Sequence, residues 1–140
     1  MKVKYQIFNT LNLVVLQFFG DWSTLATKAF VEKLITEPNF SFVEKVLIDF
    51  REVNLEPAIN DIQELIDFRK NVLSKKHTIV HLVDSPTSTV GSHLYQEGLK
   101  QVGFKCSYCS TIKQALFNLG LDITTFEMED FLKSLKYQFE

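Results

Sequence analysis

Two short apolar runs alternate with a segment of helical period, and this alternation constrains the fold more than any other feature of the sequence. The runs lie within residues 43–50 and 77–83. Continuous apolar runs of this length are typical of strands covered on both faces of a sheet. Between the runs, apolar residues recur with helical period from Pro57 to Ser74. Strands that alternate with helices predict parallel neighbours joined by right-handed crossovers.

The flanking segments extend this alternation towards both ends of the chain. Apolar segments 5–8 and 13–19 predict an opening antiparallel hairpin, and residues 104–109 predict a further strand. Helical patterns fill the remaining segments: from a Ser23 cap to the turn at Pro38, over 90–102, from a Thr111 cap to Gly120, and over 124–139.

The expected fold class is therefore α/β. We expect a mixed sheet of about five strands, with an antiparallel N-terminal edge and helices mainly on one face. Residues 1–140 are expected to form a single domain, with a core over 1–120 and a C-terminal amphipathic helix over 124–139. Gly98 lies in the middle of a predicted helix, where glycine costs about 1 kcal/mol against alanine. We expect it to let that helix approach the sheet closely.

Composition excludes several classes of protein. The chain has 140 residues, 46% hydrophobic and 23% charged, which suits one globular domain and excludes disorder as the main state. Two cysteines are too few for a disulfide scaffold. A net charge of −2 gives no basic footprint for nucleic acid or an anionic membrane. The apolar run from Leu11 to Phe19 is too short to span a membrane, and no signal segment is recognised, so a cytoplasmic location is expected.

The cysteines and histidines offer no obvious catalytic or metal site. Cys106 and Cys109 lie three residues apart on a predicted strand and should point to opposite faces. A redox pair of this spacing belongs at a helix N-terminus, so structural thiols are expected. His77 and His81 are separated by roughly 13 Å along their strand and cannot share a metal ion. We expect these two and His93 to be solvated or hydrogen-bonded, and no cofactor is predicted.

Polar residues gather where two central strands end. Asp49 and Asp84 end strands at the carboxyl edge of the predicted sheet, where open α/β sheets bind ligands. The nearby residues that could complete a ligand or partner site are Arg51, Ser85, Thr87 and Ser88. The alternative is that these side chains only cap turns and helices, with Ser88 capping the helix that follows.

The tail provides a candidate surface for self-association. Five apolar residues lie on one side of the predicted helix over 124–139: Met128, Phe131, Leu132, Leu135 and Phe139. Helices on one face of a sheet leave the other face uncovered. The tail helix, a second copy of the chain or an apolar ligand could cover it, and a large exposed apolar patch usually marks a partner. The 13 phenylalanines favour such a surface or pocket.

Three segments carry a resemblance to a known fold family. They are residues 13–20, an apolar strand that ends in Gly20; residues 46–51, an apolar strand that ends in Asp-Phe-Arg; and the helix over 111–120. Their order and spacing resemble those of STAS domains, in particular the SpoIIAA-like (STAS/SEC14-like) group of small bacterial proteins. Anti-sigma-factor antagonists of this fold are switched by phosphorylation of a serine that follows the second segment. Here Ala58 and Ile59 carry no hydroxyl, so no such switch is expected.

The expected function is a non-enzymatic cytoplasmic module that binds a regulatory protein partner and forms a homodimer through the tail. The first alternative is a small protein that binds an apolar ligand or lipid in a pocket lined by phenylalanine, as the lipid-binding cousins of the family imply. The second alternative is an enzyme that uses Asp49, Arg51 and Asp84 at the strand edge. That enzyme would require the three side chains to converge in one cleft.

Overall fold

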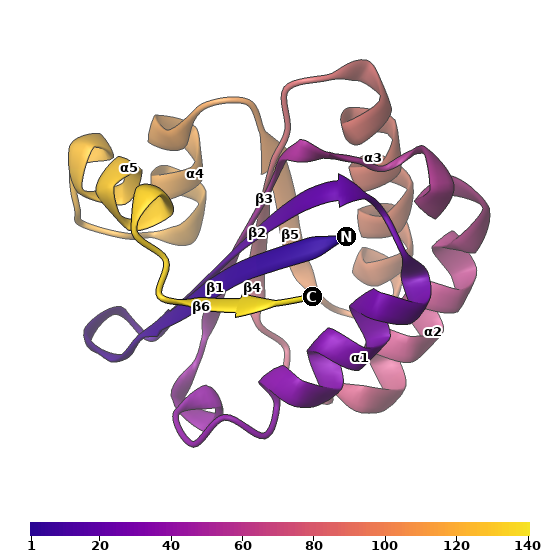
Figure 1. Ribbon diagram of the computed structural model, residues 1–140, viewed down its shortest axis with the longest axis horizontal. Coiled ribbons are helices and arrows are strands. Elements are labelled where there is room, and N and C mark those ends of the chain that lie inside the picture. The colour runs from indigo at the N-terminus through magenta and orange to yellow at the C-terminus, as the bar shows by residue number, and fades with distance from the viewer.

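A single six-stranded sheet organises the chain. The computed structural model describes all residues, 1–140. The strands are β1 (Lys2–Phe8), β2 (Leu13–Asp21), β3 (Lys45–Asn54), β4 (Thr78–Leu82), β5 (Lys105–Cys109) and β6 (Tyr137–Phe139). The helices are α1 (Thr24–Leu34), α2 (Ile62–Val72), α3 (Pro86–Gln101), α4 (Ile112–Leu119) and α5 (Thr125–Lys133) (Figure 1). Three short 3-10 helices lie at Asn9–Leu11, Phe40–Phe42 and Glu56–Asp61.

The sheet is mixed, as the sequence predicts. Its strand order is β5-β4-β3-β2-β1-β6. The strands β2, β3, β4 and β5 run parallel to their neighbours, and β1 is antiparallel to β2 and to β6. The α/β class and the antiparallel N-terminal hairpin are therefore confirmed. The sheet has six strands where about five were expected, and β1 is covered by β6 instead of forming the edge.

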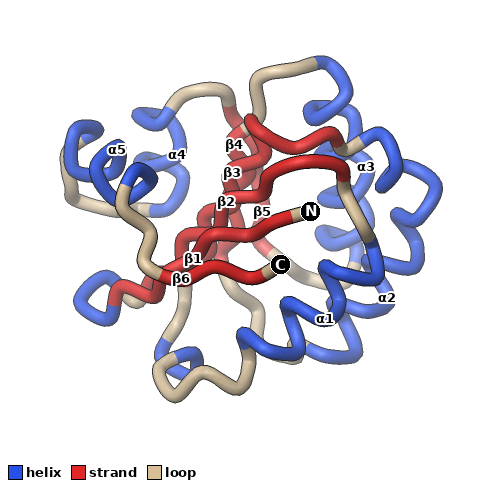
Figure 2. The backbone as a smooth tube through the Cα atoms, in the orientation of Figure 1, coloured by secondary structure: helices blue, strands red, loops and turns tan.

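Helices cover both faces of the sheet, which corrects the expectation that they lie mainly on one. Helices α1, α2 and α3 lie on one side, and α4 and α5 lie on the other (Figure 2). The first core, between the sheet and α1 to α3, contains 18 buried residues. The second core contains Leu13, Val15, Leu47 and Val80 from the strands, with Ala115, Leu116, Leu119, Met128 and Leu132 from α4 and α5. Central strands are therefore apolar on both sides, as their continuous apolar runs indicate.

Three helix ends fall at the predicted residues Ser23, Thr111 and Gly120. The Ser23 side chain accepts a hydrogen bond from the Ala26 N–H at 3.1 Å and caps α1. Thr111 caps α4 in the same way, and Gly120 ends that helix in the left-handed conformation with φ of 66°. Side-chain oxygens at these positions satisfy N–H groups that have no partner within the helix. None of the helices is long and apolar enough to cross a bilayer.

The predicted helix over 124–139 is wrong beyond Lys133. Helix α5 ends there, and residues 137–139 form β6, which pairs with β1 through Tyr137 opposite Tyr5 and Phe139 opposite Val3. Phe139 also packs against Phe30 at 5.5 Å between ring centroids. The apolar spacing of this tail suits a helix, but the free edge of β1 offers backbone hydrogen bonds that a pattern within the tail does not reveal.

The tail residues expected to face a second copy lie largely inside this chain. Met128 is 0% exposed and Leu132 is 7% exposed, because both fill the second core. Phe131 is half-buried and stacks on Phe8 at 4.2 Å between ring centroids, and Leu135 packs against the same core. Phe139 belongs to β6. The uncovered sheet face that motivated the dimer expectation is therefore covered by the chain's own α4 and α5.

Gly98 allows two helices, not a helix and the sheet, to approach each other. A Cβ placed on Gly98 of α3 would overlap the Cδ1 atom of Ile66 on α2. A close approach is confirmed there, but its partner is a neighbouring helix.

Candidate functional site

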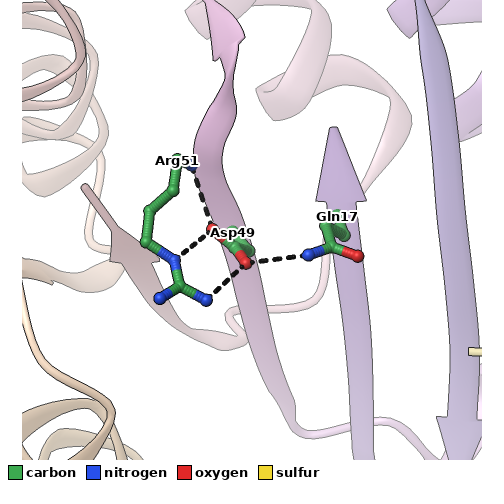
Figure 3. A network of polar contacts seen from close by, with 3 residues as sticks. All are labelled: Gln17, Asp49 and Arg51. Carbon is green, nitrogen blue, oxygen red and sulfur yellow. Dashed lines mark hydrogen bonds and ion pairs between the residues drawn. The ribbon is translucent and has the colours of Figure 1, made fainter. Parts of the chain in front are cut away.

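Two of the predicted strand-edge residues, Asp49 and Arg51, form an ion pair. Asp49 was expected to end its strand, but it lies within β3, which continues to Asn54. Asp49 is fully buried on β3, and its two carboxylate oxygens accept hydrogen bonds from Arg51 Nε and Nη2, each at 3.0 Å. Gln17 Nε2 on β2 donates to the same carboxylate at 3.1 Å, and the Arg51 backbone N–H donates at 3.0 Å (Figure 3). The carboxylate in turn raises the pKa of the Arg51 guanidinium. Both oxygens of Asp49 are therefore occupied. The ion pair lies within β3, and the hydrogen bond from Gln17 links β3 to β2.

The serines at this edge cap a helix. The Ser85 side chain accepts from the Ser88 N–H at 3.1 Å, and the Ser88 hydroxyl accepts from the Ser85 N–H at 3.2 Å. Ser85, not Ser88, is therefore the N-cap of α3, and the two form a capping box. Asp84 is exposed. Its negative charge also raises the pKa of Arg51, but less than the charge of Asp49 does. The predicted strand-edge residues therefore form an ion pair, Asp49–Arg51, and a helix cap, Ser85 with Ser88.

An apolar cavity lies between the sheet and helices α1, α2 and α3. It has a volume of about 130 Å³, and 19 of its 25 lining residues are hydrophobic. Its aromatic wall residues are Phe18, Trp22, Phe30, Phe40, Phe50, Phe68 and Tyr95. None of the six predicted strand-edge residues lines it. The cavity has the phenylalanine-rich wall that the ligand-binding alternative requires.

Several buried polar side chains interrupt this apolar wall. Arg69 of α2 is 8% exposed, and His77 and His81 at β4 are each 1% exposed; all three line the cavity. Arg69 Nη2 donates to His77 Nδ1 at 3.1 Å. His81 Nδ1 lies 3.0 Å from the hydroxyl of Ser92, which comes from α3.

Each of the three side chains also has a nitrogen without a hydrogen-bond partner. Four buried side-chain polar atoms in the chain lack one, and three of them are Arg69 Nη1, His77 Nε2 and His81 Nε2. The great majority of buried polar atoms in proteins are satisfied, so three unsatisfied atoms on residues that line one cavity require a physical explanation. The fourth atom is Gln96 Oε1, which lies outside the cavity wall.

Arg69 is the one charged side chain in the cavity wall at neutral pH. Burial, reinforced by the charge of Arg69, lowers the pKa of His77 to about 4, and burial lowers the pKa of His81 to about 3. Burial also raises the pKa of Tyr95 to about 12, so all three are neutral. Burial lowers the pKa of Arg69 as well, but a guanidinium keeps its proton in proteins. The wall contains no Asp, Glu or Lys.

Arg69 has no carboxylate partner. The ion pairs of the chain are Lys28–Glu64, Arg51–Asp49, Lys75–Glu44 and Lys100–Glu97. Besides His77, Arg69 contacts the ring of Phe104, whose centroid lies 4.8 Å from Cζ. A cation–π contact stabilises a guanidinium, but it does not supply a hydrogen-bond acceptor for Nη1.

The cysteines lie apart from this cavity. Cys106 packs against the first core and Cys109 against the second, on opposite faces of β5 as their spacing predicts. Both are free thiols, and burial raises the pKa of each, which opposes thiolate formation. No group of three or more His, Cys, Asp or Glu side chains is arranged to hold a metal ion.

Sequence reasoning identified the histidines but not their shared cavity with Arg69. The signal for Arg69 is its position in the inward stripe of α2, between Ile66 and Leu73. An arginine at such a position buries its charged guanidinium, which then needs a hydrogen-bonding or ionic partner. His81 carries a comparable signal, because it interrupts the apolar run of β4.

Comparison with protein-family models, curated proteins and solved structures finds no match for this chain.

Proposed function

We propose that the protein binds a small, largely apolar molecule in the cavity between the sheet and helices α1 to α3, as a non-enzymatic ligand-binding module. The observation that carries this proposal is the cavity itself, about 130 Å³ with a mostly hydrophobic wall. Protein interiors are packed as densely as organic crystals and contain few voids larger than a water molecule. An engineered apolar cavity of about 150 Å³ in another protein binds benzene.

The volume narrows the size of the ligand. Pockets for drug-sized molecules measure about 300–1,000 Å³. The cavity here is smaller, so it suits a single ring or a short branched chain. The sequence left open an apolar small molecule or a lipid as the ligand. This size favours the small molecule over a long-chain lipid.

The fold supports a module of the STAS type as part of this proposal. The opening antiparallel hairpin and the parallel strands β2 to β5 are compatible with the resemblance carried by residues 13–20, 46–51 and 111–120. The sixth strand and the helices on both faces differ from the arrangement expected for it. Ligand occupancy would then be the signal that the module transmits, in place of serine phosphorylation.

A second candidate function is self-association through the outer surface of α4 and α5. Phe117 on α4 is 80% exposed, and Phe126 on α5 is 71% exposed. Large apolar side chains exposed to this degree are typical of interaction sites when they form a patch. Native mass spectrometry of the chain and of a Phe117→Ser, Phe126→Ser variant tests this candidate. A dimer lost in the variant supports it, and a monomer in the unaltered chain contradicts it.

The ligand-binding proposal is tested by titration with toluene, followed by two-dimensional NMR of the backbone amides. We expect saturable shifts that concentrate at residues lining the cavity, with affinity reduced at least about tenfold by Val46→Phe, because the added ring occupies the space. The matched control is Val90→Phe, which places the same ring on an exposed position of α3 outside the cavity. Shifts that are absent, or unaffected by Val46→Phe, contradict the proposal.

A further inference from the structure

We infer that the ligand of this cavity is a small carboxylate with an apolar body, whose anionic group binds the Arg69 guanidinium. The inference rests on the proposed function and specifies its ligand class. It depends on three features of the wall: a buried charge without a counter-ion, two neighbouring hydrogen-bond donors without acceptors, and an adjoining apolar volume.

The first feature is the charge of Arg69. A buried, uncompensated charge is strongly unfavourable, and proteins pair such charges or bind ions with them. The same chain shows the usual solution on the other side of its sheet, where the carboxylate of buried Asp49 is paired with Arg51 at 3.0 Å. Arg69 is 8% exposed and has no such partner within the chain. A ligand carboxylate would supply the missing negative charge.

The second feature is the pair of unsatisfied donors. Arginine can only donate, so His77 Nδ1 must accept the hydrogen bond from Arg69 Nη2 at 3.1 Å. Neutral His77 therefore carries its proton on Nε2, which has no acceptor. Arg69 Nη1 is likewise a donor without an acceptor. An ionised carboxylate has two oxygens that only accept, so it complements two donors on adjoining side chains.

The third feature is the apolar volume beside Arg69, whose wall carries no other charge. Arg69 is the one cation there, and the remaining lining residues are apolar or neutral at pH 7. One cation balances a monoanion, whereas a phosphate carries about −1.5 to −2 at this pH. The apolar volume of about 130 Å³ takes the body of the molecule. Benzoate combines the required charge with a ring of suitable size.

The experiment compares benzoate with benzamide, which has the same ring and a neutral polar group, by isothermal titration calorimetry at pH 7. Toluene serves as the wholly apolar probe of the cavity. For the unaltered protein we expect benzoate to bind at least about tenfold more tightly than benzamide, because hydrogen bonds to a charged partner are stronger than neutral ones.

Two variants assign that preference to Arg69. Arg69→Met keeps a long apolar side chain and removes the charge, so we expect benzoate to lose its advantage over benzamide while toluene still binds. Arg69→Gln is the second variant if methionine impairs folding. The control is Lys76→Met, because Lys76 Nζ lies 4.1 Å from the same Phe104 ring but does not line the cavity. That variant should retain the full preference for benzoate.

The outcomes separate this inference from the proposed function. If toluene binds but benzoate binds no more tightly than benzamide, the carboxylate inference is wrong and the cavity remains a binding site. If benzoate keeps its advantage in Arg69→Met and Arg69→Gln, the anion is bound elsewhere and the inference is also overturned. If neither toluene nor benzoate binds, both proposals fail.

Discussion

At the scale of single residues, the two arginines of the chain have different environments: Arg51 is half-buried and Arg69 is buried. Arg51 meets Asp49 in a complete ion pair, whereas Arg69 meets a neutral histidine and an aromatic ring. The Asp49–Arg51 pair has its hydrogen bonds within the chain and contributes to stability. The environment of Arg69 leaves donors unsatisfied, which natural proteins tolerate mainly at functional sites. The two sites therefore make separable predictions about stability and about binding.

Asp49 should matter for stability and not for ligand binding. Asp49→Ala leaves Arg51 and Gln17 without their shared acceptor, so we expect the free energy of unfolding to fall by about 1–3 kcal/mol. Affinity for toluene should be unchanged, since Asp49 does not line the cavity. Urea denaturation and calorimetry measure the two quantities. Asp84→Ala, at an exposed neighbouring position, is the control and should change neither. A variant of normal stability would show that the ion pair is dispensable.

The buried histidines should make stability depend on pH. Their pKa values are lowered from 6.5, to about 4 for His77 and about 3 for His81. As the pH falls from 6.5 towards the lowered pKa values, the unfolded chain binds more protons than the folded chain, so the free energy of unfolding decreases. Above pH 6.5 both histidines are neutral in both states, and their full contribution to the free energy of unfolding is present.

Chemical denaturation at a series of pH values measures this slope. We expect His81→Gln to reduce the slope between pH 6.5 and pH 4, because one of the two depressed titrations is removed. His93→Gln, at an exposed position of α3 outside the cavity, is the matched control for the loss of a histidine. An unchanged slope in His81→Gln would show that this side chain does not titrate abnormally in the folded state.

At the scale of elements, local sequence predicts helices and strands better than it predicts their partners. The strands over β3 and β4 and the caps at Ser23, Thr111 and Gly120 follow from apolar runs and capping chemistry. The short strand β6 does not, because three residues carry no period of their own and form a strand only against the edge of β1. Gly98 shows the same limit: its position predicts a close approach, but only the packing identifies α2 as the partner.

The contact between α2 and α3 should depend on Gly98. Gly98→Ala would gain about 1 kcal/mol of helix propensity, but the new methyl group overlaps Ile66 Cδ1, so we expect a net loss of about 1–3 kcal/mol of stability. Ile66→Val removes that atom and should partly restore the Gly98→Ala variant. Gly91→Ala is the matched control in the same helix, because its Cβ would meet Leu55 at an ordinary 3.8 Å. Thermal unfolding measures all four proteins. Equal stability of Gly98→Ala and the unaltered chain would contradict the close contact.

At the scale of the whole molecule, the two cores have different roles. The second core, beneath α4 and α5, contains fully buried residues from strands and helices. The first core, beneath α1 to α3, encloses the cavity and its polar side chains. Alternation of strands and helices predicts the α/β class. It does not predict the cavity, because a void depends on how side chains from several elements fit together and not on the period of any one of them.

The measurement that tests the central claim most directly is a crystal structure of the protein under xenon pressure. Xenon enters apolar cavities of this size without requiring a particular polar contact. We expect a xenon atom in the first core, between the aromatic wall formed by Phe18, Phe30 and Phe50 and the inward side of α2. A first core closed by these side chains, with no xenon between the sheet and the helices, would contradict it.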